Sequence, residues 1–203
     1  MILFVDTETT GIVDYKAAPD APHQPRLVQL ALVLSEADRY CVRARASLMI
    51  YPEGWVVPPQ AEKVHGLSTD LCQRCGIPLD VAWSVLYTFA SHADLLVAHS
   101  AAFDRSILDG EWLRRRYVLP PLEGIWYCTM EAATPVLKLP SKHPGSEYGW
   151  PSLSEAHNFF CGIGLTGAHD ALVDAEACAR IYYALQSRTE IPHEQREPAQ
   201  ARQ

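Results

Sequence analysis

Two carboxylates stand two residues apart near the start of the chain. Asp6 and Glu8 follow the apolar run Ile2–Val5, which predicts a strand. Side chains at positions i and i+2 of a strand point to the same face, about 6.6 Å apart along the backbone. Two acids held so closely repel each other, and a cation makes the arrangement favourable. Because Mg²⁺ prefers oxygen ligands, the pair predicts a metal site, with two solvated acids at an exposed strand end as the alternative.

A third acid, Asp104, follows the apolar run that ends at Ala98 and stands near the start of a predicted helix. A carboxylate in the first turn of a helix gains about 0.3–1 kcal/mol from the helix dipole. This structural reason explains Asp104 as well as a functional one does. Phe103 beside it also has two interpretations, a core aromatic residue or a platform on which a base stacks.

His169 and Asp174 form the third candidate group, at the start of a long predicted helix. Five helical steps of 100° would leave two side chains about 140° apart. The two residues converge if His169 lies on the preceding loop and Asp174 one turn inside the helix. Asp174 has apolar neighbours on both sides, where an unpaired carboxylate is costly, so its position predicts a nearby cation. Asp170 is interpreted as the N-cap of the helix.

The elements that must position these residues follow from apolar patterns and turn residues. Strands are expected at Ile2–Val5, Leu27–Leu34, Cys41–Tyr51, Asp94–Ala98 and Gly124–Cys128. Helices are expected at Pro59–Val64, Ser68–Cys75 (with Ser68 as N-cap), Pro78–Ala90, Ala102–Arg116, Leu153–Phe160 and Asp170–Leu185. The predicted inward residues are Val81, Val85, Leu86 and Phe89 in the third helix, and Phe103, Ile107, Leu108 and Trp112 in the fourth. The proline-containing stretches 13–25 and 138–151 are expected to be loops. Strands followed by alternating helices and strands predict an α/β domain with a mixed central sheet.

The composition limits the class of protein. The chain has 203 residues, 48% of them hydrophobic, which fits one domain with a sizeable core. Six cysteines without a signal peptide suggest free thiols in a reducing cytoplasm, and we read Cys72 and Cys75 as helix-borne thiols because no second pair accompanies them. Eighteen consecutive apolar residues do not occur, so no membrane span is expected. The polar stretch Thr189–Gln203 is expected to be a disordered tail.

Taken in order, the three groups resemble the motifs of the DEDDh exonucleases, the family that includes proofreading subunits of bacterial replicative polymerases. Asp6–Gly11 resembles the first motif, Val97–Asp104 the second and His169–Ala175 the third. Weaker matches occur at Val64–Ser68, Cys128–Met130, Leu153–Ala156 and Phe159–Phe160. The matches keep the family order over residues 1–188, nearly the whole chain.

The resemblance implies an RNase H-like fold, with a five-stranded mixed sheet flanked by helices, over a domain of residues 1–188. It also implies two Mg²⁺ or Mn²⁺ ions that hydrolyse the 3′ end of a nucleic acid to nucleoside 5′-monophosphates. Asp6 would bridge both ions, Glu8 and Asp174 would complete the site of the attacking water, and Asp104 would support the second ion through water. His169 would accept a proton from that water.

The resemblance further implies substrate contacts by Thr9, Thr10, Ile12, His65, Ser100 and Phe103. Ser100 is a departure, because the family usually has Asn there and serine reaches less far. Arg114–Arg116 and the basic residues Lys138, Lys142 and His143 are candidate contacts to the nucleic-acid backbone. The net charge of −7 argues against a broad basic surface, but two divalent ions would offset four negative charges and a 3′-end trimmer grips few nucleotides.

DNA is the expected substrate, and three alternatives stay open. An enzyme trimming RNA or short oligoribonucleotides would use the same site. A non-catalytic module that binds nucleic acid or a polymerase would have no chemical reason to keep all five catalytic positions. An HD-type phosphohydrolase, suggested by His169 and Asp170, would leave Asp6 and Glu8 unexplained. A polymerase partner is compatible with the family, although the sequence has no sliding-clamp-binding segment.

Overall fold

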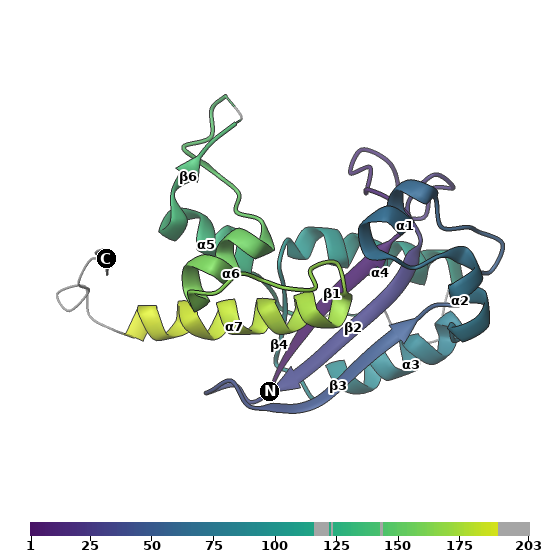
Figure 1. The fold of residues 1–203 in the computed structure, drawn as a ribbon. Coiled ribbons are helices and arrows are strands. Elements are labelled where there is room, and N and C mark those ends of the chain that lie inside the picture. Colours follow the sequence, from purple (N-terminus) through teal and green to yellow (C-terminus); the bar gives the residue numbers. More distant parts are fainter. Residues whose placement is uncertain (116–121, 123, 143, 191–203) are drawn as a thin grey trace.

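The computed structural model describes residues 1–115, 122, 124–142 and 144–190. Its central sheet has five strands in the order β3-β2-β1-β4-β5 (Figure 1). The strands are β1 Ile2–Thr9, β2 Leu27–Ser35, β3 Val42–Met49, β4 Leu95–Ala98 and β5 Trp126–Cys128. The first three pair antiparallel, whereas β4 and β5 run parallel to β1. The predicted α/β domain with a five-stranded mixed sheet is therefore confirmed.

Helices cover both faces of this sheet (Figure 1). They are α1 Pro59–His65, α2 Thr69–Cys75, α3 Leu79–Ala90, α4 Ala101–Arg115, α5 Thr129–Leu137, α6 Leu153–Cys161 and α7 Ala171–Glu190. Alternate residues of β1 separate the two cores. Leu3 and Val5 pack with α3 and α4 on one face, while Ile2 and Phe4 pack with α7 on the other. No described helix is long and apolar enough to cross a membrane.

The buried face of α3 includes the predicted Leu86, with Val85 and Phe89 packed against the core, but not the predicted Val81. Leu79, Ala82, Trp83 and Leu86 are buried, whereas Val81 is 49% exposed. The buried positions follow the i, i+3, i+4, i+7 spacing of one helical stripe. Turning the helix this way buries the indole of Trp83 and leaves the smaller Val81 in solvent, which removes more apolar surface from water.

Two features lie where no regular structure was predicted. The helix α5 contains Pro135 and ends at Leu137; its C-cap Lys138 has a left-handed φ of 51° and donates its N–H to the carbonyl of Thr134 over 3.0 Å. The predicted loop 138–151 contains an antiparallel hairpin of β6 Leu139–Pro140 and β7 Tyr148–Gly149. A Cβ on Gly149 would lie 2.8 Å from the Pro140 carbonyl oxygen, so the two short strands pair this closely only with glycine there.

The remaining expectations concern the cysteines and the chain end. All six cysteines are free, and on α2 Cys72 is buried while Cys75 is exposed, as expected for helix-borne thiols. The predicted tail began at Thr189, but α7 continues to Glu190. Residues 191–203 and the candidate contacts Arg116 and His143 lie outside the described residues.

Candidate active site at the C-terminal end of strand β1

The two acids of β1 continue the row of side chains that faces α7. Ile2 and Phe4 pack on that helix, and Phe4 meets the ring of Tyr182 edge-on at 5.6 Å. Because side chains alternate along a strand, Asp6 and Glu8 extend the same row beyond the core. Strand geometry thus carries both carboxylates towards the start of α7, as the spacing predicted.

The start of α7 is fixed by hydrogen bonds from its first backbone N–H groups. The Asp170 carboxylate accepts from the N–H groups of Leu172 at 2.9 Å and Val173 at 3.2 Å, so Asp170 is the N-cap as predicted. The N–H of Ala171 donates to the Gln29 side chain on β2 over 3.3 Å. These bonds hold the end of the helix against the sheet.

His169 and Asp174 meet in the way that their spacing requires. His169 lies on the loop before α7 with a left-handed φ of 68°, and its N–H donates to Asp174 Oδ2 over 3.0 Å. Glu8, His169 and Asp174 each offer one possible metal-ligand atom, and these three atoms lie within 4.8 Å of one another. The other oxygen of Asp174, Oδ1, is buried and has no hydrogen-bond partner among the described residues. A buried carboxylate oxygen without a partner is unfavourable, and a divalent cation would satisfy it.

Asp104 approaches the site from the opposite side of β1. It lies in the first turn of α4, is 2% exposed and accepts a hydrogen bond from the Thr7 hydroxyl over 2.8 Å. Thr7 stands between Asp6 and Glu8 and points to the other face of the strand. After burial, the charge of Asp104 contributes most to the raised pKa of Asp6, so the two carboxylates are neighbours.

Burial makes all four carboxyl groups harder to ionise, and neighbouring acidic charges add to this at Asp6, Glu8 and Asp174. Burial, then Asp174 and Asp104, raise the pKa of Glu8 to about 8. Burial raises the pKa of Asp104 to about 7, although the hydrogen bond from Thr7 partly opposes it. Burial, Asp104, Asp174 and Glu8 together raise the pKa of Asp6 well above its ordinary value. Burial also raises the pKa of Asp174, against the N–H and charge of His169. Divalent cations would reverse this penalty, and the oxygen-rich donor set fits Mg²⁺ or Mn²⁺.

The predicted substrate contacts Thr9 and Thr10 use their hydroxyl groups within the protein. Thr9 Oγ1 donates to the carbonyl of Gly11 over 2.7 Å. Thr10 Oγ1 accepts from the N–H of Arg26 over 2.8 Å, and the Thr10 N–H donates to the Arg26 carbonyl. Both side chains therefore shape the loop that follows β1. Ile12, at 88% exposed, is free to contact a ligand.

His65, Ser100 and Phe103 lie around the same end of the sheet. His65 is close enough to the Thr9 backbone and to His169 for both to affect its pKa, which burial lowers. Ser100 occupies the turn between β4 and α4 with a left-handed φ of 73°. Asn, the usual family residue, tolerates this conformation better than serine does. Phe103 is partly buried against the core, which favours its structural interpretation.

Three residues near the site were not singled out from the sequence. Thr7 holds Asp104, and the alternation of side chains along β1 could have indicated it. His99 binds Thr129 Oγ1 and the Pro151 carbonyl oxygen, each at 3.0 Å, from within the second matched segment. Burial and, to a smaller extent, the charge of Asp104 raise the pKa of Tyr15. Tyr15 comes from an irregular loop whose pattern carries no such signal.

Comparison with solved structures identifies three similar exonucleases. Exonuclease X, in complex with 5′ overhanging duplex DNA, matches with a TM-score of 0.64 and 21% identity over 96% of both chains. E. coli Exonuclease I with a dT13 oligonucleotide matches with a TM-score of 0.69 and 19% identity over 93% of this chain, which spans only 41% of that enzyme. The nuclease domain of 3′hExo, a DEDDh family member bound to rAMP, matches with a TM-score of 0.69 and 16% identity over 94% of both chains.

Comparisons based on sequence alone find no match, either to a family model or to a curated protein. At these low identities the structural matches establish the fold alone. The chain therefore has the RNase H-like fold of the DEDDh 3′→5′ exonucleases.

Proposed function

We propose that the protein is a metal-dependent 3′→5′ exonuclease that hydrolyses phosphodiester bonds at single-stranded or frayed 3′ ends of DNA and releases nucleoside 5′-monophosphates. One observation carries the proposal. Asp6, Glu8, Asp104 and Asp174 converge beside His169 at one end of the sheet, and their charges penalise one another. A protein that never binds cations would gain stability by losing several of these acids.

The four carboxylates would hold two Mg²⁺ or Mn²⁺ ions. When bound, such ions activate water at neutral pH and stabilise the charge that develops on the phosphoryl group. The Oδ1 of Asp174, which has no hydrogen-bond partner within the described ranges, and the raised pKa of Glu8 both support this use of the site. Thr7 would orient Asp104 through its hydroxyl hydrogen bond.

His169 would accept the proton from the attacking water. Its side chain is exposed, so substrate can reach the ring, while its backbone N–H is anchored on Asp174. Imidazole changes its protonation near neutral pH, as a general base at physiological pH requires. The left-handed backbone of His169 turns the chain sharply before α7, which places this exposed ring beside the acids.

DNA is the proposed substrate, with RNA as the second candidate. Two of the similar structures contain DNA and the third contains the ribonucleotide rAMP, so this fold accommodates both kinds of nucleotide in other proteins. Matched 3′-labelled DNA and RNA oligonucleotides, single-stranded and duplex, would be digested with Mg²⁺ or Mn²⁺. Faster release of 5′-mononucleotides from single-stranded DNA supports the proposal, and faster release from RNA replaces it with an RNA-trimming activity.

The same assay separates an enzyme from a non-catalytic binding module. Asp174→Asn removes a proposed ligand while keeping the size of the side chain. Asp38→Asn, at a carboxylate with 73% side-chain exposure, is the matched control. We expect the first variant to lose activity and the control to keep it. Wild-type protein that binds oligonucleotides but releases no nucleotide with either metal would identify a binding module.

A further inference from the structure

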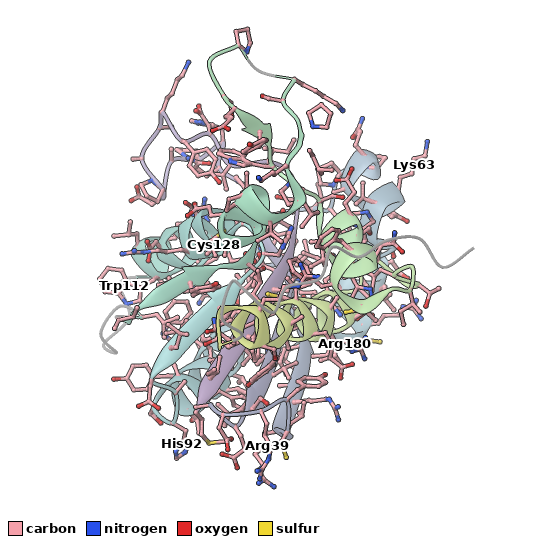
Figure 2. All side chains as sticks on the ribbon, turned by 90° about the vertical axis from the view of Figure 1, so that its left-hand side faces the viewer. Arg39, Lys63, His92, Trp112, Cys128 and Arg180 are labelled. Carbon is pink, nitrogen blue, oxygen red and sulfur yellow. The ribbon has the colours of Figure 1, made fainter. Side chains whose placement is uncertain are left out.

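The β6–β7 hairpin, with Trp150 directly after it, forms a surface that the proposed chemistry does not use. The indole of Trp150 is 71% exposed, although tryptophan is usually covered. The hairpin projects from the end of α5 on the side of the molecule away from the N-terminus, and α1 lies across the molecule from it (Figure 1). In Figure 2, after a quarter turn, the hairpin is at the top of the molecule, opposite the end that carries Arg39 and His92.

His99 ties this surface to the proposed catalytic end of the sheet. His99 directly follows β4, and its ring binds the Pro151 carbonyl oxygen at 3.0 Å. Trp150 directly precedes Pro151, the residue that His99 binds. His99 itself lies on the segment that leads from β4 to Asp104. On the other side of Pro151, Ser152 and Glu155 form the capping box that begins α6. The position of Trp150 relative to the acids is thus fixed from both sides.

Trp150 shares a surface cavity with a second aromatic residue and a lysine. The cavity has a volume of about 690 Å³, and its lining includes Leu139, Pro140, Lys142, Tyr148, Trp150 and Glu155. Lys138 lies over the ring of Tyr148, with Nζ 5.9 Å from the ring centroid. Among the described residues neither Lys138 nor Lys142 forms an ion pair, whereas several arginines do, such as Arg26 with Glu111.

This combination fits a single nucleic-acid strand. Bases stack on exposed aromatic rings whatever their sequence, and lysines beside the rings attract the backbone. The cavity is not strongly basic, because Glu155 also lines it, although that carboxylate accepts hydrogen bonds from the N–H and hydroxyl of Ser152 at 2.8 and 2.7 Å. Stacking therefore contributes more here than charge does, and binding should depend only moderately on salt.

We propose that Trp150 and the β6–β7 hairpin bind the nucleotides on the 5′ side of the scissile bond, with bases stacked on Trp150 and Tyr148 and phosphates near Lys138 and Lys142. The inference rests on the exonuclease function proposed above, since it assigns this surface to the same substrate. It predicts that the enzyme gains affinity from nucleotides beyond the terminal one.

The test compares substrates of different length on the full chain. The p-nitrophenyl ester of thymidine 5′-monophosphate offers one nucleotide, whereas dT12 reaches the hairpin. For Trp150→Ala we expect the KM for dT12 to rise about tenfold, as expected for the loss of one stacked base, with the KM for the ester unchanged. Trp150→Phe should restore most of the affinity for dT12. Tyr40→Ala is the control, because Tyr40 is 38% exposed and adjoins Arg39 at the opposite end of the molecule (Figure 2).

Each outcome is informative. An unchanged KM for dT12 in Trp150→Ala, or an equal rise for dT12 and the ester, would overturn the proposed surface. Circular dichroism checks that the variant is folded, which the exposure of the side chain leads us to expect. Wild-type protein that hydrolyses neither substrate would overturn the exonuclease proposal itself, so the two failures are distinct.

Discussion

The backbone N–H of His169 and the Oδ2 atom of Asp174 are joined by a hydrogen bond of 3.0 Å that spans the start of α7. The bond fixes Asp174 by one oxygen and leaves Oδ1 buried, without a hydrogen-bond partner in the described part of the chain. It also fixes the loop from which the His169 ring projects. One contact thus sets the geometry of a proposed metal ligand and of the proposed general base.

Variants of His169 can remove the imidazole ring while they keep the backbone N–H that binds Asp174. His169→Gly retains the N–H and accommodates the left-handed φ of 68°, whereas His169→Ala retains the N–H under strain. Because both variants lose the base, we expect kcat to fall about 10²–10⁴-fold in each, as is usual for general acid–base catalysis. Single-turnover hydrolysis of labelled oligonucleotide measures this. A glycine variant with a near wild-type rate would exclude His169 as the base.

Thr7→Val tests the support of Asp104. Valine has the shape of threonine but cannot donate the 2.8 Å hydrogen bond, so the pKa of Asp104 should rise further and its carboxylate should bind cations less well. We expect the Mg²⁺ concentration for half-maximal rate to rise roughly 10–100-fold, with a smaller change at saturating metal. The measurement is a Mg²⁺ titration of the initial rate. A titration curve that overlays the wild-type curve would contradict the assignment.

Stability of the metal-free protein should depend on pH through the acid cluster. The pKa values of Glu8 and Asp104 in the folded state, about 8 and about 7, exceed those of the unfolded chain, near 4. Ionising these groups therefore costs more in the folded state, and stability falls as pH rises from about 4 to above 8. With EDTA, we expect Glu8→Gln to raise the melting temperature more at pH 8.5 than at pH 6. Equal shifts at both pH values would mean that the pKa of Glu8 is not raised in the folded protein.

The loop after β1 depends on a buried ion pair. Arg26 Nε and Nη2 bind Glu111 at 2.8 and 3.0 Å, and Glu111 is 1% exposed. Arg26→Met would leave that buried carboxylate with Arg114 Nη1 at 3.4 Å and the Leu27 N–H at 3.0 Å as its described partners. Removing one partner of a buried ion pair costs up to about 3–5 kcal/mol in the free energy of unfolding. Urea denaturation measures the loss. Arg43→Met, which breaks a half-exposed pair with Glu36, is the control and should cost about 1 kcal/mol or less. Similar losses in both variants would show that burial of Glu111 is unimportant.

Much of the fold and the candidate site could be predicted because it depends on local geometry. The alternation of β1 places Asp6 and Glu8 on one face, and the 100° step of a helix already required His169 to lie before α7. The cap by Asp170 likewise involves only residues within one turn. Such relationships need no knowledge of distant parts of the chain.

The rest depends on contacts between distant segments. Val81 and Trp83 compete for the core side of α3, and only the packed neighbours decide that Trp83 is buried. The β6–β7 hairpin occurs in a stretch whose prolines and glycines predict a loop. Its link to the site runs from His99 to Pro151, 52 residues later in the chain, which no local pattern reports.

The most direct test of the central claim is release of 5′-mononucleotides from 3′-labelled DNA by wild-type protein and Asp174→Asn, side by side with Mg²⁺ or Mn²⁺. We predict metal-dependent release by the wild type, abolished by EDTA. Loss of a residue that only supports a metal ligand typically costs roughly 10–100-fold in activity. Asp174→Asn removes a proposed ligand itself, so its rate should fall by more than this. Release that persists in EDTA, or near wild-type release by Asp174→Asn, would contradict the proposed two-metal site.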